Sequence, residues 1–211
     1  MEVRTPRSVL YDGGLYGRLV EPMLSGVHGF VADRLPEGAR VLDACCGTGG
    51  LAMRLAGAGR EVTGVDLSPR NIAFAQGRAE ATDLPVRFEV ADVAAFEPPE
   101  GRFDVASVVL AIHEMPARFR RPLLANLVRI ATRVMLVDFA APMRWNVAGA
   151  FNRMVEMAAG REHFGNFRDF SRRGGLAPLV EELGLEVEMS RTINAGTMQI
   201  YVVSAPTDGS S

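Results

Sequence analysis

A run of small and polar residues follows the first strongly apolar segment of the chain and has the composition of a ligand-binding turn. The segment is Val41-Leu-Asp-Ala-Cys-Cys-Gly-Thr-Gly-Gly50, an apolar strand pattern that enters a glycine turn and then the helical pattern 51–56. Gly47 and Gly49 carry no side chain where the backbone must turn sharply and approach a ligand closely. We therefore expect a ligand crevice at the carboxyl end of this strand. Taken alone, the spacing Gly47-x-Gly49-x-x-Ala52 also fits a dinucleotide-binding fingerprint.

Three carboxylates distinguish between the ligands that such a turn can bind. Asp66 ends the second strand pattern, 19 residues after Gly47, where a carboxylate can accept both ribose hydroxyls of an adenosine. Asp92 follows the third strand pattern, where an acidic side chain can accept an amino group of adenine. Asp43 lies just before the turn, where it would repel a diphosphate and attract an α-ammonium group. The set favours an adenosine ligand that carries an ammonium group and no phosphate.

Short β-branched runs alternate with amphipathic stretches, a pattern typical of βαβ units around a mostly parallel sheet. The strand patterns occupy 40–44, 61–65, 86–91, 103–110 and 133–139, and a terminal hairpin joins 185–193 to 198–204. The helical patterns span 51–56, 68–80, 117–130, 145–159 and 177–183, with a polar, aromatic loop after the fourth of them. We predict an α/β fold, a doubly wound sheet with helices on both faces, whose carboxyl edge gathers the glycine turn and the carboxylates.

Together these motifs resemble the class I S-adenosylmethionine-dependent methyltransferases. The matching pieces, which extend over roughly residues 10 to 204, are V-L-D-A-C-C-G-T-G at 41–49, V-T-G-V-D-L-S at 62–68, A-D-V at 91–93, F-D-V-A at 103–106 and the terminal hairpin. The resemblance implies a Rossmann-like, seven-stranded sheet whose last strand is antiparallel. It also implies that S-adenosylmethionine is the cofactor.

The same resemblance implies which residues bind the cofactor. Asp43 and Gly47 would lie near its methionine part and Asp66 at its ribose. Asp92 and Val93 would lie at its adenine. We expect further contacts from Tyr11, Tyr16, Cys45, Gly49, Leu67 and Ala111. The two tyrosines belong to N-terminal helices expected at about 8–35, where an aromatic face can attract the sulfonium; the alternative is that they are half-buried helix residues. Cys45 stands where the family usually has glycine.

Within that family the chain is most similar to the ubiquinone/menaquinone-biosynthesis methyltransferases. They share the C-C-G-T-G turn and a segment like Ser25-Gly26-x-His28 before it. Two of their features differ: Ala111-Ile-His-Glu-Met115 replaces their arginine-asparagine element, and their later leucine-lysine-proline-glycine-glycine segment is missing. A quinol acceptor is therefore left open.

His113 and Glu114 follow the fourth strand pattern, at the rim of the predicted crevice. Because an unperturbed imidazole titrates near pH ~6.5, His113 can accept a proton from a phenol, enol, thiol or amine acceptor. The alternative is that His113 only caps a helix or bonds a backbone carbonyl. His163 lies in the segment 161–170, which we interpret either as a substrate lid or as a loop that packs its phenylalanines on the sheet. The catalytic candidates are therefore His113, Glu114 and His163.

The same three side chains are of types that bind metal ions. They are scattered along the chain, however, and do not show the close spacing of a metal-binding motif. We therefore expect no metal in the site.

Composition narrows the class of protein further. The 211 residues carry a net charge of −2, and all 23 basic residues are arginine. Without lysine there is no P-loop lysine and no lysine Schiff base, and without a polycationic balance we expect no nucleic acid partner. The only cysteines, Cys45 and Cys46, are adjacent and cannot form a disulfide framework, which indicates a reducing compartment. We expect a cytoplasmic protein with no stable membrane insertion.

These observations predict one methyltransferase domain over 1–205, in which about 140–178 is either a substrate lid or a segment packed on the sheet, and a polar tail at 206–211. The expected function is methyl transfer from S-adenosylmethionine to a small molecule, with a hydrophobic acceptor as one option. The alternatives are a nicotinamide-dependent oxidoreductase and a catalytically inactive cofactor-binding interaction module. The acceptor atom and the oligomeric state are left open.

Overall fold

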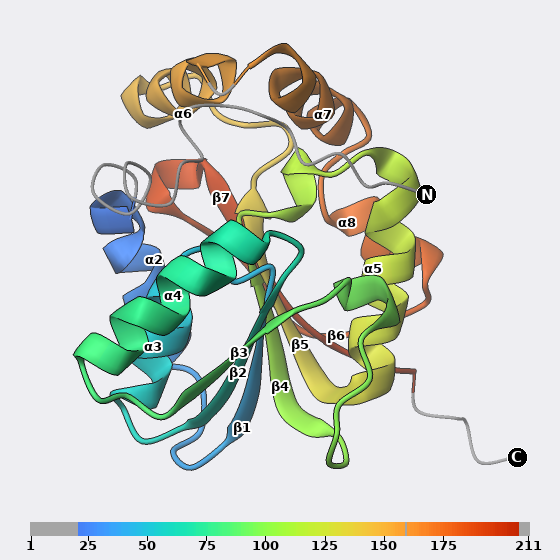
Figure 1. Ribbon diagram of the computed structural model, residues 1–211. Helices are drawn as coiled ribbons and strands as arrows, with labels where there is room; N and C mark the ends of the chain where they lie inside the picture. The colour runs from blue at the N-terminus through green and yellow to red at the C-terminus, as the bar shows by residue number, and fades with distance from the viewer. Residues whose placement is uncertain (1–20, 159, 207–211) are drawn as a thin grey trace, which may run out of the picture.

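The computed structural model describes residues 21–158 and 160–206, which form a seven-stranded sheet with helices around it. The strand order is β3-β2-β1-β4-β5-β7-β6 (Figure 1). The pairs β3–β2, β2–β1, β1–β4 and β4–β5 are parallel, whereas β7 runs antiparallel to β5 and β6. The predicted doubly wound sheet with an antiparallel last strand is confirmed.

Each strand overlaps the segment predicted for it. The bounds of β1 to β7 are Arg40–Ala44, Glu61–Asp66, Val86–Val90, Phe103–Val109, Ala131–Phe139, Glu186–Ile193 and Met198–Ser204. The central strands β1, β4 and β5 are the most apolar and the most buried, as expected of parallel strands that helices cover on both faces. Since parallel strands end at one edge, residues after β1, β2, β3 and β4 meet there.

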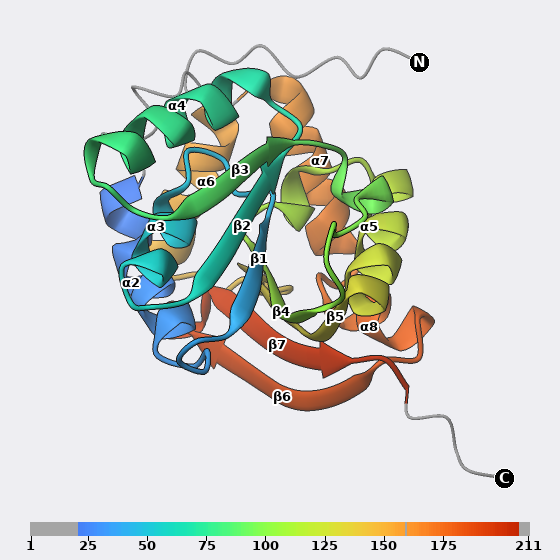
Figure 2. The ribbon, with the colours of Figure 1, turned by 60° about the horizontal axis from the view of Figure 1, so that its bottom comes forward.

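Helices cover both faces of the sheet (Figure 2). One face carries α2 (Glu21–Ala32), α3 (Gly50–Ala56) and α4 (Pro69–Ala81), and the other carries α5 (Ala117–Ile130) and α8 (Ala177–Glu182). Local sequence explains where α4 begins, because the Ser68 hydroxyl accepts a hydrogen bond from Asn71 N at 3.3 Å and proline is the first helical residue. These two layers hold the strand ends in place.

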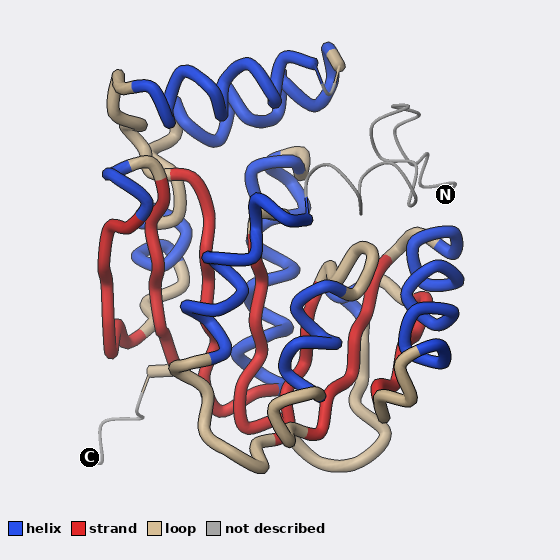
Figure 3. The backbone as a smooth tube through the Cα atoms, turned by 90° about the vertical axis from the view of Figure 1, so that its left-hand side faces the viewer, coloured by secondary structure: helices blue, strands red, loops and turns tan. Residues whose placement is uncertain are grey.

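Two further helices, α6 (Val147–Ala158) and α7 (Arg161–Arg172), lie above the carboxyl ends of the strands, at the top of Figure 1. The same layer is visible above the strands in Figure 3. The loop predicted over 161–170 is wrong, because this segment is helical. Gly165 and Asn166 lower its local helix propensity, but His163, Phe167 and Phe170 recur with helical spacing and are buried, so tertiary packing overrides propensity.

Some predictions fall on parts of the chain about which the structure says nothing. Tyr11, Tyr16 and most of the predicted tail lie outside the described residues. Of the described helices, none combines the length and apolar character needed to cross a membrane.

Candidate active site

The glycine turn between β1 and α3 has a backbone conformation that favours glycine. Cys45, Gly47 and Gly49 have φ angles of 59°, 53° and 79°. A Cβ at Gly49 would lie 2.7 Å from Phe88 Cζ, whereas one at Gly47 would meet nothing within 4 Å. Gly49 is therefore needed for packing, and Gly47 leaves open space beside the end of β1. Cys45 adopts a left-handed conformation at the position where the resembling family usually has glycine.

Asp43 lies next to the end of β1 and is 3% exposed. Its Oδ1 lies 3.5 Å from the Ser107 hydroxyl, and its buried Oδ2 has no hydrogen-bond partner among the described residues. Burial raises the pKa of Asp43 to about 7, and hydrogen bonds from Ala52 and Ser107 offset only part of this effect. A cationic group beside Oδ2 would supply the missing partner and favour the ionised carboxylate.

Asp66 at the end of β2 faces the same turn. Its Oδ2 accepts a hydrogen bond from Gly47 N at 2.9 Å, and its Oδ1 accepts one from Ser68 N at 2.8 Å. Burial raises the pKa of Asp66 against these backbone hydrogen bonds. Each oxygen keeps a lone pair for a further donor, so the carboxylate is oriented and still able to accept two hydroxyls. Leu67, the next residue, is 46% exposed.

The loop after β3 is held by a residue that sequence analysis did not select. Asp92 Oδ1 accepts from Ala94 N at 2.9 Å and begins the short 3₁₀ helix η2 (Val93–Ala95). The buried Asn126 amide of α5 donates to the carbonyls of Val93 and Phe96 at 2.7 and 2.9 Å. A polar residue at a buried position of an amphipathic helix is the signal that identifies Asn126.

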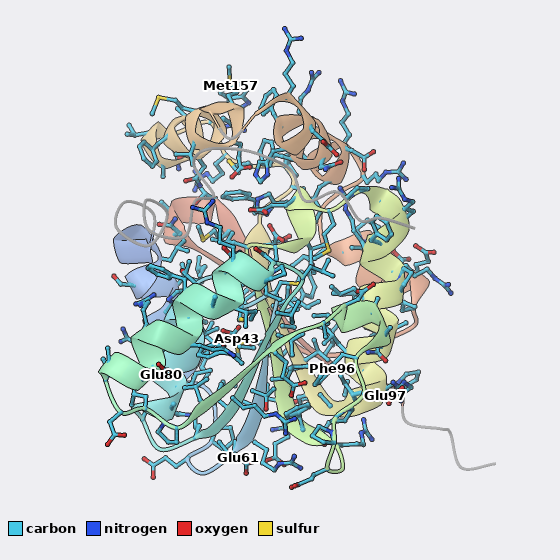
Figure 4. All side chains as sticks on the ribbon, viewed as in Figure 1. Asp43, Glu61, Glu80, Phe96, Glu97 and Met157 are labelled. Atoms are coloured by element: carbon cyan, nitrogen blue, oxygen red, sulfur yellow. The ribbon has the colours of Figure 1, made fainter. Side chains whose placement is uncertain are left out.

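We call Asp43, Gly47, Asp66 and Asp92 the cofactor edge, because they follow or end the neighbouring strands β1, β2 and β3. Figure 4 shows Asp43 in the interior of the fold and Glu61 at the opposite end of the sheet. Among the other predicted cofactor residues, Val93 is buried beside Asp92, and Ala111 is half-buried at the start of η3 (Ile112–Glu114).

His113, in η3, is only 1% exposed rather than open at a rim. Its Nδ1 lies 2.7 Å from Asp138 Oδ1, and its backbone N donates to Asp138 Oδ2 at 3.1 Å. Asp138 is fully buried in β5, where its Oδ1 also accepts from Phe139 N at 2.7 Å. These bonds fix the imidazole so that Nε2 points away from Asp138.

The other two catalytic candidates and a fourth residue converge on this Nε2. Glu156 Oε2, from α6, lies 3.5 Å from His113 Nε2 and 2.6 Å from His163 Nε2. Glu114 Oε1 lies 3.9 Å from His113 Nε2 and 3.7 Å from His163 Nε2. Sequence analysis singled out His113, Glu114 and His163, and the structure brings all three together. We call these three with Asp138 and Glu156 the cap cluster.

The charges of the cap cluster strongly shift two pKa values, those of His113 and Glu156. Burial opposes the charged form of His113, but the carboxylates of Asp138 and Glu156 outweigh burial and hold the pKa of His113 well above its ordinary value. Burial would raise the pKa of Glu156, but the adjacent imidazoles of His113 and His163 hold it at about 2. The cluster therefore favours positive charge between its carboxylates.

The cap cluster borders the cofactor edge at Cys45. Burial raises the pKa of the Cys45 thiol well above its ordinary value, and the negative charges of Asp66, Asp43, Glu114 and Asp92 raise it further. Cys45 is therefore within electrostatic range of carboxylates from both sets.

A buried arginine fastens α7 to the rest of the site. Arg120, from α5, is 2% exposed and donates to Met115 O at 3.0 Å, to Asn166 O at 3.0 Å and to Asp169 Oδ2 at 2.9 Å. Asn166 Nδ2 donates in turn to Glu114 O at 2.8 Å. These bonds set the distance between η3 and α7, and hence between Glu114 and His163.

Sequence analysis missed Asp138, Glu156, Arg120 and Asn166. Asp138 interrupts the apolar run of β5, and Glu156 interrupts the apolar helix α6; both are buried. Because an unpaired buried carboxylate is costly, a charge at such a position indicates a polar partner. That signal was present in the sequence, but the identity of the partners was not.

Comparison with known proteins gives one family. A family model described as a methyltransferase domain matches residues 41–148, which include the cofactor edge and η3.

Two curated relatives and one solved structure are similar to the chain. The ribosomal protein L11 methyltransferase of Burkholderia mallei is 34% identical over 130 residues, 61% of this chain and 41% of that protein. The demethylmenaquinone methyltransferase of Thermus thermophilus is 35% identical over 117 residues, 53% of this chain and 50% of that protein. The chain thus spans half or less of the length of these relatives.

The solved structure is the magnesium protoporphyrin IX methyltransferase of Synechocystis PCC 6803 with bound S-adenosylhomocysteine. It has a TM-score of 0.62 and 19% identity, and the match covers 96% of this chain and 90% of that one. At this identity the similarity is one of fold.

Proposed function

The chain belongs to the methyltransferase domain family, and from that membership we propose that it transfers the methyl group of S-adenosylmethionine to a small acceptor molecule bound at the cap cluster. When bound, S-adenosylmethionine supplies an electrophilic methyl group on a sulfonium. The remaining work of binding, orientation and water exclusion falls to this chain's own residues.

One observation carries the cofactor part of the proposal: Asp43 Oδ2 is buried without a hydrogen-bond partner among the described residues, in the strand that leads into the Gly47 turn. An α-ammonium group fits this position because it brings both a donor and a positive charge. A diphosphate does not fit, because it would lie against a carboxylate. This chemistry favours S-adenosylmethionine over a nicotinamide dinucleotide.

The other carboxylates of the cofactor edge take the nucleoside. Asp66 is oriented by Gly47 N and Ser68 N and accepts the two ribose hydroxyls with its remaining lone pairs. Asp92 is oriented by Ala94 N and accepts the adenine amino group. Asn126 holds the loop that carries Val93, which lies against the adenine ring.

The acceptor meets the cap cluster at Glu114. The Glu114 side chain is 30% exposed, whereas those of His113, Glu156 and His163 are each below 8%. Glu114 is therefore the member that contacts an incoming O–H, N–H or S–H group, and the histidines behind it set its position and charge. The helices α6 and α7 above it keep water from the reacting atoms.

The elements around Glu114 bear on which acceptor molecule binds. The similar proteins named above differ in acceptor, since their names refer to a ribosomal protein, a menaquinone precursor and a porphyrin. The acceptor is thus set by α6, α7 and the cap cluster of this chain. In the described residues α6 exposes Phe151, Met154 and Met157, an apolar surface that supports the hydrophobic option among the acceptors considered from the sequence.

Calorimetric titration of the chain with S-adenosylhomocysteine tests the cofactor site. We expect one saturable site, no saturable binding of NADH or NADPH, and roughly 10- to 150-fold weaker binding in Asp43→Asn, the range for a hydrogen bond to a charged group. Glu61→Gln, at the far end of the neighbouring strand, is the matched control and should bind normally. Saturable NADH binding without S-adenosylhomocysteine binding would overturn the proposal.

The acceptor is sought by incubating the chain with S-adenosylmethionine labelled in its methyl group and a panel of phenols, thiols, carboxylic acids and amines. Labelled product should form with wild type and with Glu162→Gln, an exposed control on α7. Glu114→Gln should lose turnover while keeping its affinity for S-adenosylhomocysteine. Equal turnover in Glu114→Gln and wild type would contradict the role given to Glu114.

A further inference from the structure

We propose that His113, His163, Glu156 and Glu114 bind a divalent transition-metal ion, with Zn²⁺ as the reference ion. The spacing of these residues along the chain does not predict a metal, because the adjacent pair His113 and Glu114 is far in sequence from Glu156 and His163. In the folded chain, however, single ligand atoms of His113, Glu114 and His163 lie within 4.8 Å of one another. Glu156 adds a fourth ligand atom to the same space.

The distances between the ligand atoms are those of a coordination shell. With metal–ligand bonds of about 2.1 Å, the ligand atoms of a tetrahedral site lie about 3.4 Å apart. The observed separations around His113 Nε2 are 3.5 Å to Glu156 and 3.9 Å to Glu114, and His163 Nε2 lies 3.7 Å from Glu114. Only the 2.6 Å contact between His163 and Glu156 must lengthen, which exchanges a hydrogen bond for two bonds to the ion.

His113 is oriented as a ligand. An Nδ1–H that donates to Asp138 Oδ1 at 2.7 Å leaves the lone pair on Nε2, the usual arrangement of a carboxylate behind a metal-binding histidine. His113 is 1% exposed, and its buried Nε2 has no hydrogen-bond partner among the described residues. A buried nitrogen of this kind, aimed at two carboxylates and a second imidazole, indicates that a cation completes the arrangement.

Charge supports a cation at this point. Asp138, Glu156 and Glu114 bring three carboxylates to two imidazoles. The nearby guanidinium of Arg120 is committed to Met115 O, Asn166 O and Asp169. A divalent ion would balance these carboxylates.

The ligand set also indicates the kind of metal. Two imidazoles with carboxylates suit Zn²⁺ or a similar transition-metal ion better than Mg²⁺ or Ca²⁺, which prefer oxygen ligands. His113, His163 and Glu156 are buried and would hold the ion, and Glu114 lies on the accessible side. Glu114 is the only one of the four ligands whose side chain is more than 8% exposed, so it marks the side from which the ion would be reached.

Metal binding does not depend on the proposed methyl transfer, so each proposal can be disproved without the other. The tag-free full chain is treated with a chelator, dialysed and titrated with ZnCl₂ by calorimetry. S-adenosylhomocysteine affinity is measured on the same samples. We expect one Zn²⁺ per chain. Substitution with Co²⁺ should give the visible ligand-field absorption of a four-coordinate site.

Four variants and a control locate the ion. Glu156→Gln and His163→Gln should each weaken Zn²⁺ binding by at least about 100-fold. Glu114→Gln, which is partly exposed and least able to disturb folding, should weaken it about 10-fold. Asp138→Asn should cost 10- to 100-fold, the usual effect of losing the group that orients a metal-binding histidine. Glu162→Gln, which removes a carboxylate one residue from His163, should stay within twofold of wild type. All five variants should keep S-adenosylhomocysteine affinity within threefold.

Three results would overturn the proposal: no saturable Zn²⁺ or Co²⁺ binding by wild type, unchanged Zn²⁺ affinity in both Glu156→Gln and Glu114→Gln, or saturable binding of methylammonium in place of Zn²⁺. The last would mean that the cluster takes an organic cation. If Zn²⁺ fails to bind while S-adenosylhomocysteine binds normally, the metal site is excluded and the proposed function stands; the reverse result excludes the proposed function alone.

Discussion

The cofactor edge and the cap cluster both place carboxylates at the carboxyl end of the sheet, but they are built differently. At the cofactor edge, backbone N–H groups of the turns that follow the strands fix Asp66 and Asp92, as Gly47 N and Ser68 N do for Asp66. In the cap cluster the side chains of η3, β5, α6 and α7 fix one another. The first arrangement is complete once the strands pair, whereas the second exists only after α6 and α7 have docked.

This difference predicts that the two regions fail independently, and the largest effect should come from Asp66. Asp66→Ala removes the acceptor of two ribose hydroxyls and should weaken S-adenosylhomocysteine binding by roughly 2 to 4 kcal/mol. Zn²⁺ affinity should not change, because the cap cluster residues are held by one another rather than by Asp66. Calorimetry with each ligand measures both. Unchanged nucleoside affinity would mean that Asp66 does not hold the ribose.

The next largest effect should come from Arg120, which acts on the other region. Arg120→Met keeps the apolar part of the side chain but removes the bonds to Met115 O, Asn166 O and Asp169. Because three half-buried acceptors lose the donor that joins α7 to η3 and α5, the free energy of unfolding should fall by about 2 to 3 kcal/mol. Urea denaturation measures this loss, and hydrogen exchange should be faster in α7 than in α3. Equal acceleration in both helices would contradict the independence of the two regions.

The pH dependence of cofactor binding tests the role of Asp43, whose pKa is about 7 in the folded chain. The pKa of Asp43 in the folded chain is higher than the value of about 4 in the unfolded chain. The stability that the protonated carboxyl group contributes is therefore fully present below about pH 4 and is lost as the pH rises through 7. A bound ammonium group favours the ionised carboxylate. S-adenosylhomocysteine affinity should therefore rise roughly 20-fold between about pH 5.5 and 7.5.

The control for this titration is Asp43→Asn, which has no carboxyl group at this position to titrate. Its affinity should be lower and nearly independent of pH over the same range. Calorimetry at each pH, in buffers of different ionisation enthalpy, would also show proton release on binding to wild type near pH 6. A rise of equal size in Asp43→Asn would assign the effect to another group.

The smallest effect is expected at Cys45, whose φ of 59° costs an L-residue about 1 to 2 kcal/mol. Cys45→Gly relieves this strain, but glycine loses about 0.5 to 1 kcal/mol through its greater unfolded-state entropy. The free energy of unfolding should thus change by no more than about 1 kcal/mol, as measured by denaturation. Gly49→Ala is the contrast, because its Cβ would lie 2.7 Å from Phe88, and it should destabilise by several times as much.

The sequence alone located the residues of the cofactor edge at strand ends and the succession of the strand segments along the chain. The strands β1 and β7 have the predicted bounds, and the turn from Gly47 to Gly49 and the positions of Asp66 and Asp92 follow directly from strand ends. These features are local: a strand pattern, a glycine turn and a residue one or two positions after a strand lie within short stretches of chain. Parallel pairing then brings such strand ends together without further information.

Only the tertiary structure decided how α6 and α7 close the site. The helix α7 forms although Gly165 disfavours it, because His163 and Phe167 gain burial against η3 and β5. Asp138 and Glu156 were identifiable as charges at apolar positions, but their partners lie in other elements. Contacts between side chains so far apart depend on the packing of whole helices, and no local pattern encodes which charge meets which imidazole.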